Sequence, residues 1–296
     1  MLTDQQMPAL FHAADIASKK AQGLFVNMMR ANLILLVVAS LTGVYSFDDF
    51  FCKKWVAIIS IILLVVSTGI TLIVDGYKWE DVWYEGRAVA ESAKTLAWRY
   101  ATCAEPFLSN LSSELIDDKL REDLGLLMNN KKGLADFMSN KDINRLYISE
   151  EMRAARTLSF QDRLNGYLID RVLPQKEWYS GKANFNQNRR NVWFKAIVAT
   201  QVAAIICGVL VASSPDTKIN LTSFFAAITS AGIAWLQIRR HQELNRSYNI
   251  TALELGSVYD KSRSVKSEQY LAIYIADAEA AISREHTLWL ARRDVF

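Results

Sequence analysis

The sequence predicts an all-α polytopic membrane protein with four transmembrane helices, in two hairpins that form a tandem parallel repeat, and a cytoplasmic helical bundle. Three observations lead to this fold class. The stretch 55–74, WVAIISIILLVVSTGITLIV, contains no charge, and twenty residues at about 1.5 Å each cross the roughly 30 Å hydrocarbon core. Backbone groups find no water in that core, so the stretch must be helical. Three further apolar runs alternate with long charged segments of helical periodicity.

Composition agrees with a few spans that carry a large aqueous part. Hydrophobic residues make up 51% of the chain, and its mean hydropathy is slightly positive, which is high for a soluble protein and low for a transporter. The net charge of +3 is too small to indicate a nucleic-acid partner by itself. The three cysteines have no metal or disulfide spacing. With four prolines and twelve glycines, long disordered linkers are not expected.

Each half of the chain repeats one pattern, in which an amphipathic helix leads into a hairpin of spans and a long cytoplasmic helix follows. We predict modules 1–160 and 161–296. The predicted spans are 31–47, 55–74, 196–212 and 221–238. Parallel repeats of this kind are related by an axis along the membrane normal and can surround a pore.

The cytoplasmic part is predicted to be helical between these spans. An amphipathic helix over 3–30 precedes the first span, and Ser149 is expected to cap a helix with two glutamates in its first turn. Pro174 is expected either to kink the helix over 166–188 or to begin it afresh. Two further helices are predicted over 77–104 and 112–138.

The distribution of lysine and arginine predicts the orientation. Eleven basic residues flank one side of the spans: Lys19, Lys20, Arg30, Lys78, Arg87, Lys182, Arg189, Arg190, Lys195, Arg239 and Arg240. The other side has Lys53, Lys54 and Lys218. Both termini and the large middle segment should therefore be cytoplasmic.

Both second spans carry a weakly polar stripe. Ser60, Ser67 and Thr71 share one helical face. The residues of the fourth span that fall within an arc of roughly 100° are Thr222, Thr229, Ser230 and Gln237. Such side chains either bond to their own helix and allow close helix packing, or they line a pore. A pore with this uncharged surface would pass small ions with little selectivity.

The helix after the second span carries a cluster of charged and aromatic residues, namely Arg87, Glu91, Lys94, Trp98 and Arg99. The spacing lets Arg87 pair with Glu91, and Glu91 with Lys94 or Thr95. Two interpretations stay open. The cluster is either a network that holds helices or subunits together, or a latch for a gate, because this helix continues from the second span.

The residues after each hairpin and before the next resemble the SLATT family, two-transmembrane effector domains that associate with nucleotide-signal defence systems of bacteria. The resemblance is carried by GRAVAESAKTLAWRY (86–100), YLIDRVLPQKEWYSGKA (167–183) and AEAAISREHTLWLAR (278–292). Three motifs in this order around two hairpins imply two SLATT modules in tandem. The resemblance also implies a pore-forming effector that stays inactive until a signal arrives, with a nucleotide-derived ligand as the usual trigger.

A basic strip precedes the third span. It consists of Arg163, Arg171, Lys176, Lys182, Arg189 and Arg190, with Trp178 and Tyr179 interleaved. Anchoring at the cytoplasmic side and contact with anionic headgroups explain such a strip. A site for a phosphate-bearing ligand, with aromatic rings that stack on a base, is the alternative.

No catalytic, metal or cofactor site is expected, because the three histidines lack a nucleophile pattern and no glycine-rich phosphate loop is present. The main hypothesis is a homo-oligomeric gated channel in the bacterial inner membrane that depolarises its host in defence against phage. A partner nucleotidyltransferase would supply its nucleotide or short oligonucleotide. A tetramer is compatible with these observations, but the sequence does not determine the subunit number. The alternatives are a scaffold that recruits a cytosolic partner and a membrane-anchored enzyme.

Overall fold

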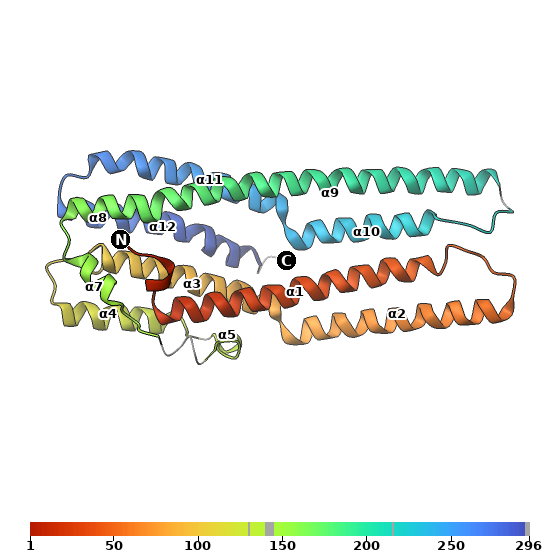
Figure 1. Ribbon diagram of the computed structural model, residues 1–296, viewed down its shortest axis with the longest axis horizontal. Helices are drawn as coiled ribbons and strands as arrows, with labels where there is room; N and C mark the ends of the chain where they lie inside the picture. The colour runs from red at the N-terminus through yellow and green to blue at the C-terminus, as the bar shows by residue number, and fades with distance from the viewer. Residues whose placement is uncertain (130, 140–144, 215, 294–296) are drawn as a thin grey trace. The chain divides into compact units, whose positions relative to one another are not determined.

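The computed structural model describes residues 1–129, 131–139, 145–214 and 216–293, with the helical backbone alone over 284–293. The side chains at the end of the tail motif, 284–292, therefore lie outside the described residues. All named elements in these ranges are helices, as predicted (Figure 1). They are η1 (Asp4–Gln6), α1 (Ala9–Leu41), α2 (Phe50–Tyr77), α3 (Trp79–Ala101), α4 (Ser113–Leu126), α5 (Lys132–Ala135), α7 (Glu150–Arg156), α8 (Phe160–Tyr167), η2 (Leu168–Val172), α9 (Leu173–Ser213), α10 (Thr222–Arg239), α11 (His241–Lys261), η3 (Ser262–Ser264) and α12 (Glu268–Arg293).

The chain forms two compact units that each draw on both halves of the sequence. The apolar unit consists of Gly23–Trp79 and Asn184–Asn245. The polar unit consists of Met1–Gln22, Glu80–Ala183 and the chain from Arg246 onward. These structural units therefore divide the chain differently from the modules 1–160 and 161–296 predicted from its sequence.

Three helical stretches are long and apolar enough to cross a membrane, namely Ala9–Leu41, Phe50–Ala101 and Phe160–Ser213. Our prediction of four spans is thus corrected to three by length and composition. The fourth predicted span, 221–238, does form a helix, α10. Serine and threonine interrupt its apolar residues, and Gln237 and Arg239 lie in its last turn, which lowers its mean hydropathy.

Several helix ends follow the local signals in the sequence. Ser149 caps α7 as predicted, because its hydroxyl accepts a hydrogen bond from the Met152 N–H at 3.3 Å. The predicted helix over 3–30 and the first span are one helix, α1, preceded by the short turn η1. Ser159 caps α8 separately, so the helix begun at Ser149 is shorter than its apolar pattern suggests.

Hydrogen bonds between polar side chains join neighbouring helices of the apolar unit. The Asn32 amide on α1 donates to Thr71 on α2 at 3.2 Å and accepts a hydrogen bond from Ser67. Thr200 on α9 and Thr229 on α10 are 2.8 Å apart. Figure 1 shows α1 beside α2, and α9 beside α10.

The turns after α1 and α9 are also joined within the apolar unit. The Ser46 N–H donates to the Lys218 carbonyl at 2.8 Å, and the Asn220 N–H donates to the Val44 carbonyl at 2.7 Å. An ion pair between Asp48 and Lys218 lies beside these bonds. The two halves of the chain are therefore linked at their turns by backbone as well as by charge.

Both α2 and α10 end at a basic residue with a left-handed backbone. Lys78 has φ 47° and ψ 40°, and Arg240 has φ 44° and ψ 35°. A new helix begins at the next residue in each case. This conformation costs a residue other than glycine about 1–2 kcal/mol, so the same unfavourable break occurs at equivalent places in both halves.

We predict that Asn32→Ala destabilises the packing of α1 on α2 by about 1 kcal/mol, because two interhelical hydrogen bonds of modest strength are lost. Reversible unfolding in mixed detergent micelles measures this change. Asn27→Ala removes an exposed amide from the same helix and is the matched control. Equal losses for both variants would contradict the assignment of Asn32 as the polar contact.

Candidate functional site

A fully buried carboxylate lies at the centre of the polar unit. Glu279 on α12 has no exposed surface. Its Oε1 accepts hydrogen bonds from the Tyr167 hydroxyl and the Arg171 Nε, each at 2.9 Å. Its Oε2 accepts hydrogen bonds from the Thr95 hydroxyl at 2.8 Å and the Arg171 Nη2 at 2.9 Å. Four donors on three side chains thus satisfy both oxygens.

The local sequence places these donors on different elements. Thr95 lies on α3, Tyr167 is the last residue of α8, and Arg171 lies in the π-helical turn η2. Pro174 follows this turn and has no N–H to donate to the carbonyl of Asp170, while its ring would crowd that carbonyl in a regular α-helix. A widened π turn accommodates such a conflict and is frequent at functional sites. The helix therefore continues through Pro174 by way of η2 and does not begin afresh there.

The buried ion pair between Arg171 and Glu279 is tolerated only while both partners are present. The side chain of Arg171 is 1% exposed and that of Glu279 is 0% exposed. Moving both charges out of water is costly, and loss of one partner leaves the other charged and buried, at a cost of about 3–5 kcal/mol. The pair thus makes the mutual arrangement of η2 and α12 sensitive to any change that separates them.

Two buried donors beside this pair have no acceptor among the described residues. They are the Trp98 Nε1–H and the Arg171 Nη1. Both residues line a cavity of about 400 Å³ in the polar unit, together with Lys94, Asp170 and residues of the N-terminal segment such as Thr3. Buried donors are nearly always hydrogen-bonded, so these two N–H groups are placed to donate hydrogen bonds to an oxygen of a ligand or of water in the cavity.

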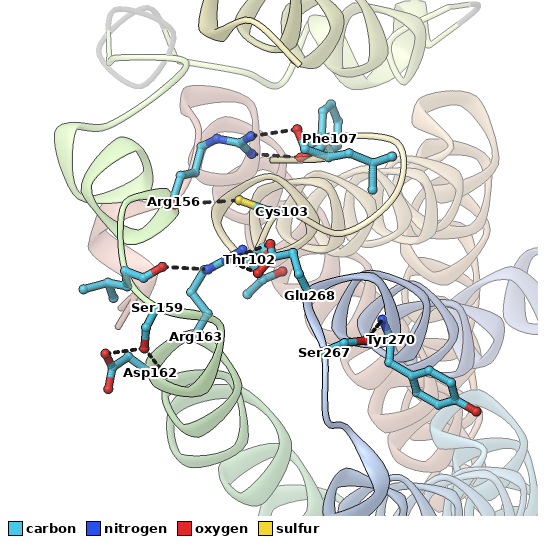
Figure 2. A network of polar contacts seen from close by, with 12 residues as sticks. Thr102, Cys103, Phe107, Arg156, Ser159, Asp162, Arg163, Ser267, Glu268 and Tyr270 are labelled. Atoms are coloured by element: carbon cyan, nitrogen blue, oxygen red, sulfur yellow. Dashed lines mark hydrogen bonds and ion pairs between the residues drawn. The ribbon is translucent and has the colours of Figure 1, made fainter. Parts of the chain in front are cut away.

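Arginines also hold the end of α3 (Figure 2). Arg163 is buried and donates to both Glu268 oxygens, at 2.6 and 2.7 Å, and to the Thr102 carbonyl at 3.0 Å. Arg156 donates to the Phe107 carbonyl at 3.1 Å and to the Tyr100 carbonyl. Arg163 and Arg156 thus satisfy the Thr102 and Tyr100 carbonyls, which the α-helix leaves open at its C-terminal end, so this cluster stabilises the fold.

A second carboxylate, Asp117 on α4, ties that helix to α3 and α7. It accepts a hydrogen bond from the Tyr100 hydroxyl at 2.6 Å and two from Arg153, at 2.5 and 3.2 Å. Burial would raise the pKa of Asp117, but these hydrogen bonds and the charges of Arg153 and Arg121 outweigh burial, and the pKa is lowered from its ordinary 3.8.

The comparisons with known proteins agree with the two modules in tandem that the sequence motifs imply. The family model "SMODS and SLOG-associating 2TM effector domain 3" matches residues 8–164, and the model "SMODS and SLOG-associating 2TM effector domain 1" matches residues 167–289. The chain belongs to the SLATT family. Two SLATT modules in tandem are therefore confirmed, and SLATT domains are two-transmembrane effector domains of defence systems. No curated protein and no solved structure matches the chain.

The buried carboxylate site combines residues of both SLATT modules. Thr95 and Trp98 lie within the first matched stretch, and Tyr167, Arg171 and Glu279 lie within the second. The sequence had singled out Trp98 and Arg171 for separate roles. Glu279 belongs to the tail motif 278–292, but nothing in the sequence indicated its contact with Arg171, which is 108 residues away.

The other predicted network residues are divided among different contacts. Arg87 and Glu91 pair along α3 at 3.8 Å, as predicted. Lys94 pairs with Asp4 at 2.6 Å rather than with Glu91. Arg99 donates to the Ala276 carbonyl on α12 at 2.9 Å. These contacts within one chain favour the network that holds helices together.

The predicted ligand residues are spread along one continuous helical stretch. From Arg163 to Arg190 it extends about 40 Å at 1.5 Å per residue, so they cannot all contact one small ligand. Arg163 and Arg171 are paired with carboxylates in the polar unit. The other six lie on α9: Lys176, Trp178, Tyr179, Lys182, Arg189 and Arg190.

Within that group, aromatic contacts prevail. Trp178 and Tyr179 each lie 5.5 Å from the ring of Tyr248 on α11, and the Lys182 ammonium lies 5.8 Å from the Trp178 ring. Arg190 lies over Phe194 at 5.7 Å. The Lys176 Nζ lies near the backbone of α11 at Gly256.

The two polar stripes differ in exposure. In α2, Ser67 is buried and Ser60 is half-buried, whereas Thr71 is exposed beside Asn32. In α10, Thr229 is buried against Thr200, and the Thr222 hydroxyl is buried without a partner among the described residues. Ser230 and Gln237 are exposed. Within one chain, the stripe of α2 therefore serves packing on α1, and half of the α10 stripe points outward.

No group of three or more His, Cys, Asp or Glu side chains is placed to hold a metal ion in the part of the chain that the structure describes. His12 is in van der Waals contact with the Phe11 ring, and buried His241 bonds Asn186 at 2.8 Å. The His286 side chain lies outside the described residues.

We predict that Glu279→Leu and Arg171→Leu each lower the stability of the purified protein by about 3–5 kcal/mol, because each leaves one buried charge without its partner. The double variant Arg171→Leu/Glu279→Leu should lose clearly less than the sum of the two. Thermal unfolding in nonionic detergent measures all three. The exposed Asp277→Asn on the same helix is the control, and additive losses would contradict the coupling.

We also predict an acid-sensitive contribution from Asp117. Its lowered pKa means that the carboxylate stabilises the fold above its unfolded pKa near 3.9, and that this stability is lost as the pH falls through the folded value. The difference in melting temperature between the natural protein and Asp117→Asn should therefore shrink as the pH falls from 7 to below 3. A difference that stays constant over this range would exclude the proposed ionic contact.

Proposed function

We propose that this SLATT protein is an oligomeric pore-forming effector, a gated ion channel that depolarises the inner membrane of its own bacterial cell during phage attack. The signal would be a nucleotide or short oligonucleotide from a partner nucleotidyltransferase. We further propose that the protein is not an enzyme and that conduction itself arrests the infected cell. The family supports a membrane effector, and the geometry of one helix supports a pore.

The outward face of α10 carries the proposal. The exposed side chains of this helix are Ser223, Ala226, Ser230, Ile233 and Gln237. They recur at intervals of three and four residues, so they form a single face. The exposed residues of α2 are by contrast mostly large and apolar, for example Ile61, Ile62, Val65 and Leu72. A face with two serines and a glutamine is unfavourable in lipid and suits water or a neighbouring subunit.

A pore needs several copies of this chain. Four helices are too few to enclose a water-filled path comfortably, so the conducting species would be a homo-oligomer around a symmetry axis. In this arrangement neighbouring subunits shield α10 from lipid, which would explain why its hydropathy is lower than that of the three candidate spans. We propose that both termini are cytoplasmic, because the excess of lysine and arginine lies on that side.

The breaks at Lys78 and Arg240 supply a route for gating. In each half, the first helix of the pair runs on without interruption (α1 and α9), while the second ends at a left-handed residue. A ligand that binds one arrangement of the polar unit better than another would shift the population of states. We propose that such a ligand binds in the cavity beside Trp98 and Arg171, where two donors lack an acceptor among the residues that the structure describes.

Ion flux through purified protein in liposomes tests the proposal. Flux is measured without ligand and then with nucleotides and short oligonucleotides. A ligand-dependent flux would establish a channel and reveal whether its resting state is open or closed. Tight vesicles under every condition, from protein shown to be inserted and oligomeric, would contradict it and support the scaffold.

We predict that Ser230→Leu/Gln237→Leu lowers the flux by about tenfold or more, because the change makes the proposed pore wall apolar and favours loss of water. Oligomer size should stay unchanged. Gln201→Leu on α9 is the matched control, since its exposed neighbours Val198, Val202 and Ile205 are apolar. Undiminished flux in an intact oligomer of the double variant would remove this face from the pore.

A further inference from the structure

A groove within the apolar unit has an apolar wall. The cavity measures about 660 Å³, and its side walls come from α1 and α10. The apolar lining consists mainly of Ile34, Val37, Val38, Ile228, Ala231 and Gly232. From Arg30 at its mouth to Val38, the α1 side extends about 12 Å, enough for part of an acyl chain.

Three arginines from three helices gather at one end of this groove. They are Arg30 on α1, Arg189 on α9 and Arg239 on α10. The guanidinium groups of Arg30 and Arg239 lie 5.3 and 5.8 Å from the centre of the Trp235 ring, and that of Arg189 lies 5.3 Å from Phe185. Aromatic faces thus orient all three cations.

This cationic cluster has no counter-charge within the described residues. None of the three forms an ion pair there, although the adjacent Arg240 pairs with Glu243. Arg30 and Arg189 lie close enough to Arg239 for their positive charges to repel it. Three like charges that face one another without an anion are unfavourable, so an anionic group at the mouth of the groove would stabilise them.

The shape and charge of the groove select the occupant. Guanidinium groups bind phosphate oxygens through paired hydrogen bonds, and Trp193 and Trp235, whose rings are 6.4 Å apart, are typical of the membrane interface. We propose that this groove binds one anionic phospholipid, with its phosphate on Arg30, Arg189 and Arg239 and an acyl chain along α1 and α10. The aliphatic wall favours a lipid over a soluble nucleotide, which would need polar partners for its base.

The position of the lipid has a structural consequence. The helices α1 and α10 come from different SLATT modules, so a bound lipid would bridge the two modules within the apolar unit. The inference requires that the apolar unit lies in a membrane, but it does not depend on conduction. Its failure and the failure of the pore proposal can therefore be observed separately.

Native mass spectrometry of the full chain in detergent tests the site directly. The probes are phosphatidylglycerol, phosphatidylcholine with matched acyl chains, inorganic phosphate and a short oligonucleotide. We expect preferential retention of phosphatidylglycerol, lowered by about tenfold or more in Arg30→Gln/Arg239→Gln, since two charge-assisted contacts are lost. Arg190→Gln, an exposed arginine that does not line the groove, should retain it normally.

A second variant keeps the proposal testable if the double variant does not fold. Val38→Trp leaves the arginines in place but fills the groove, and it should also lower retention. Equal retention of both lipids, or normal retention in the folded variants, would overturn the proposal. Binding of phosphate or oligonucleotide through these arginines, without retained phospholipid, would replace the lipid with a soluble ligand.

Discussion

The buried carboxylate of Glu279 joins α3, α8, η2 and α12 within the polar unit. A carboxylate without access to water is tolerated only if both oxygens accept hydrogen bonds and a cation lies close. Tyr167, Arg171 and Thr95 meet that requirement, from elements that are far apart in the sequence. Each of these elements must therefore keep its position for the others to be stable.

The interdependence explains why two sequence modules do not form two separate folds. Thr95 belongs to the first SLATT module, and the other three residues belong to the second. Each compact unit likewise contains chain from both halves. The two modules therefore interlock within the polar unit, where shared hydrogen bonds couple the contacts of one module to those of the other.

The two halves also repeat the same local backbone features. In each, a long first helix continues without a break, and the second ends at a basic left-handed residue, Lys78 or Arg240. Since that conformation is unfavourable for a side chain with a Cβ, its occurrence at both equivalent places indicates a requirement of the surrounding structure. In our account the two breaks let the helices after α2 and α10 change direction as a pair.

Much of the fold was predictable because it depends on local or periodic signals. The charge-free stretch 55–74 required a helix, and three motifs in order indicated the SLATT family. Ser149 was predictable as a cap because a cap needs only its own side chain and the next turn. The amphipathic pattern before the first span did not show that α1 would continue without interruption.

The site was harder to predict, since its contacts connect distant residues. No sequence spacing reveals the ion pair between Arg171 and Glu279. Lys94 pairs with Asp4, although Glu91 is much nearer to it in the sequence. A polar stripe predicts a special face but not its partner. In the structure, Asn32 contacts the stripe of α2, and Thr200 contacts Thr229 in the stripe of α10. Ser230 and Gln237 of the α10 stripe are exposed instead. The apolar run 221–238 also led to the prediction of a fourth span. The serines and threonines of α10 and the charge of Arg239 in its last turn lower its hydropathy below that of the three candidate spans.

Hydrogen–deuterium exchange on the purified full-length protein and on Glu279→Gln tests the central claim most directly. The variant keeps the size of the side chain and removes its charge. Our account predicts faster exchange in α3, α8 with η2, and α12 together, while α2 and α10 keep their protection. Faster exchange confined to α12 would contradict the account, because it would show that the carboxylate does not hold the other two elements.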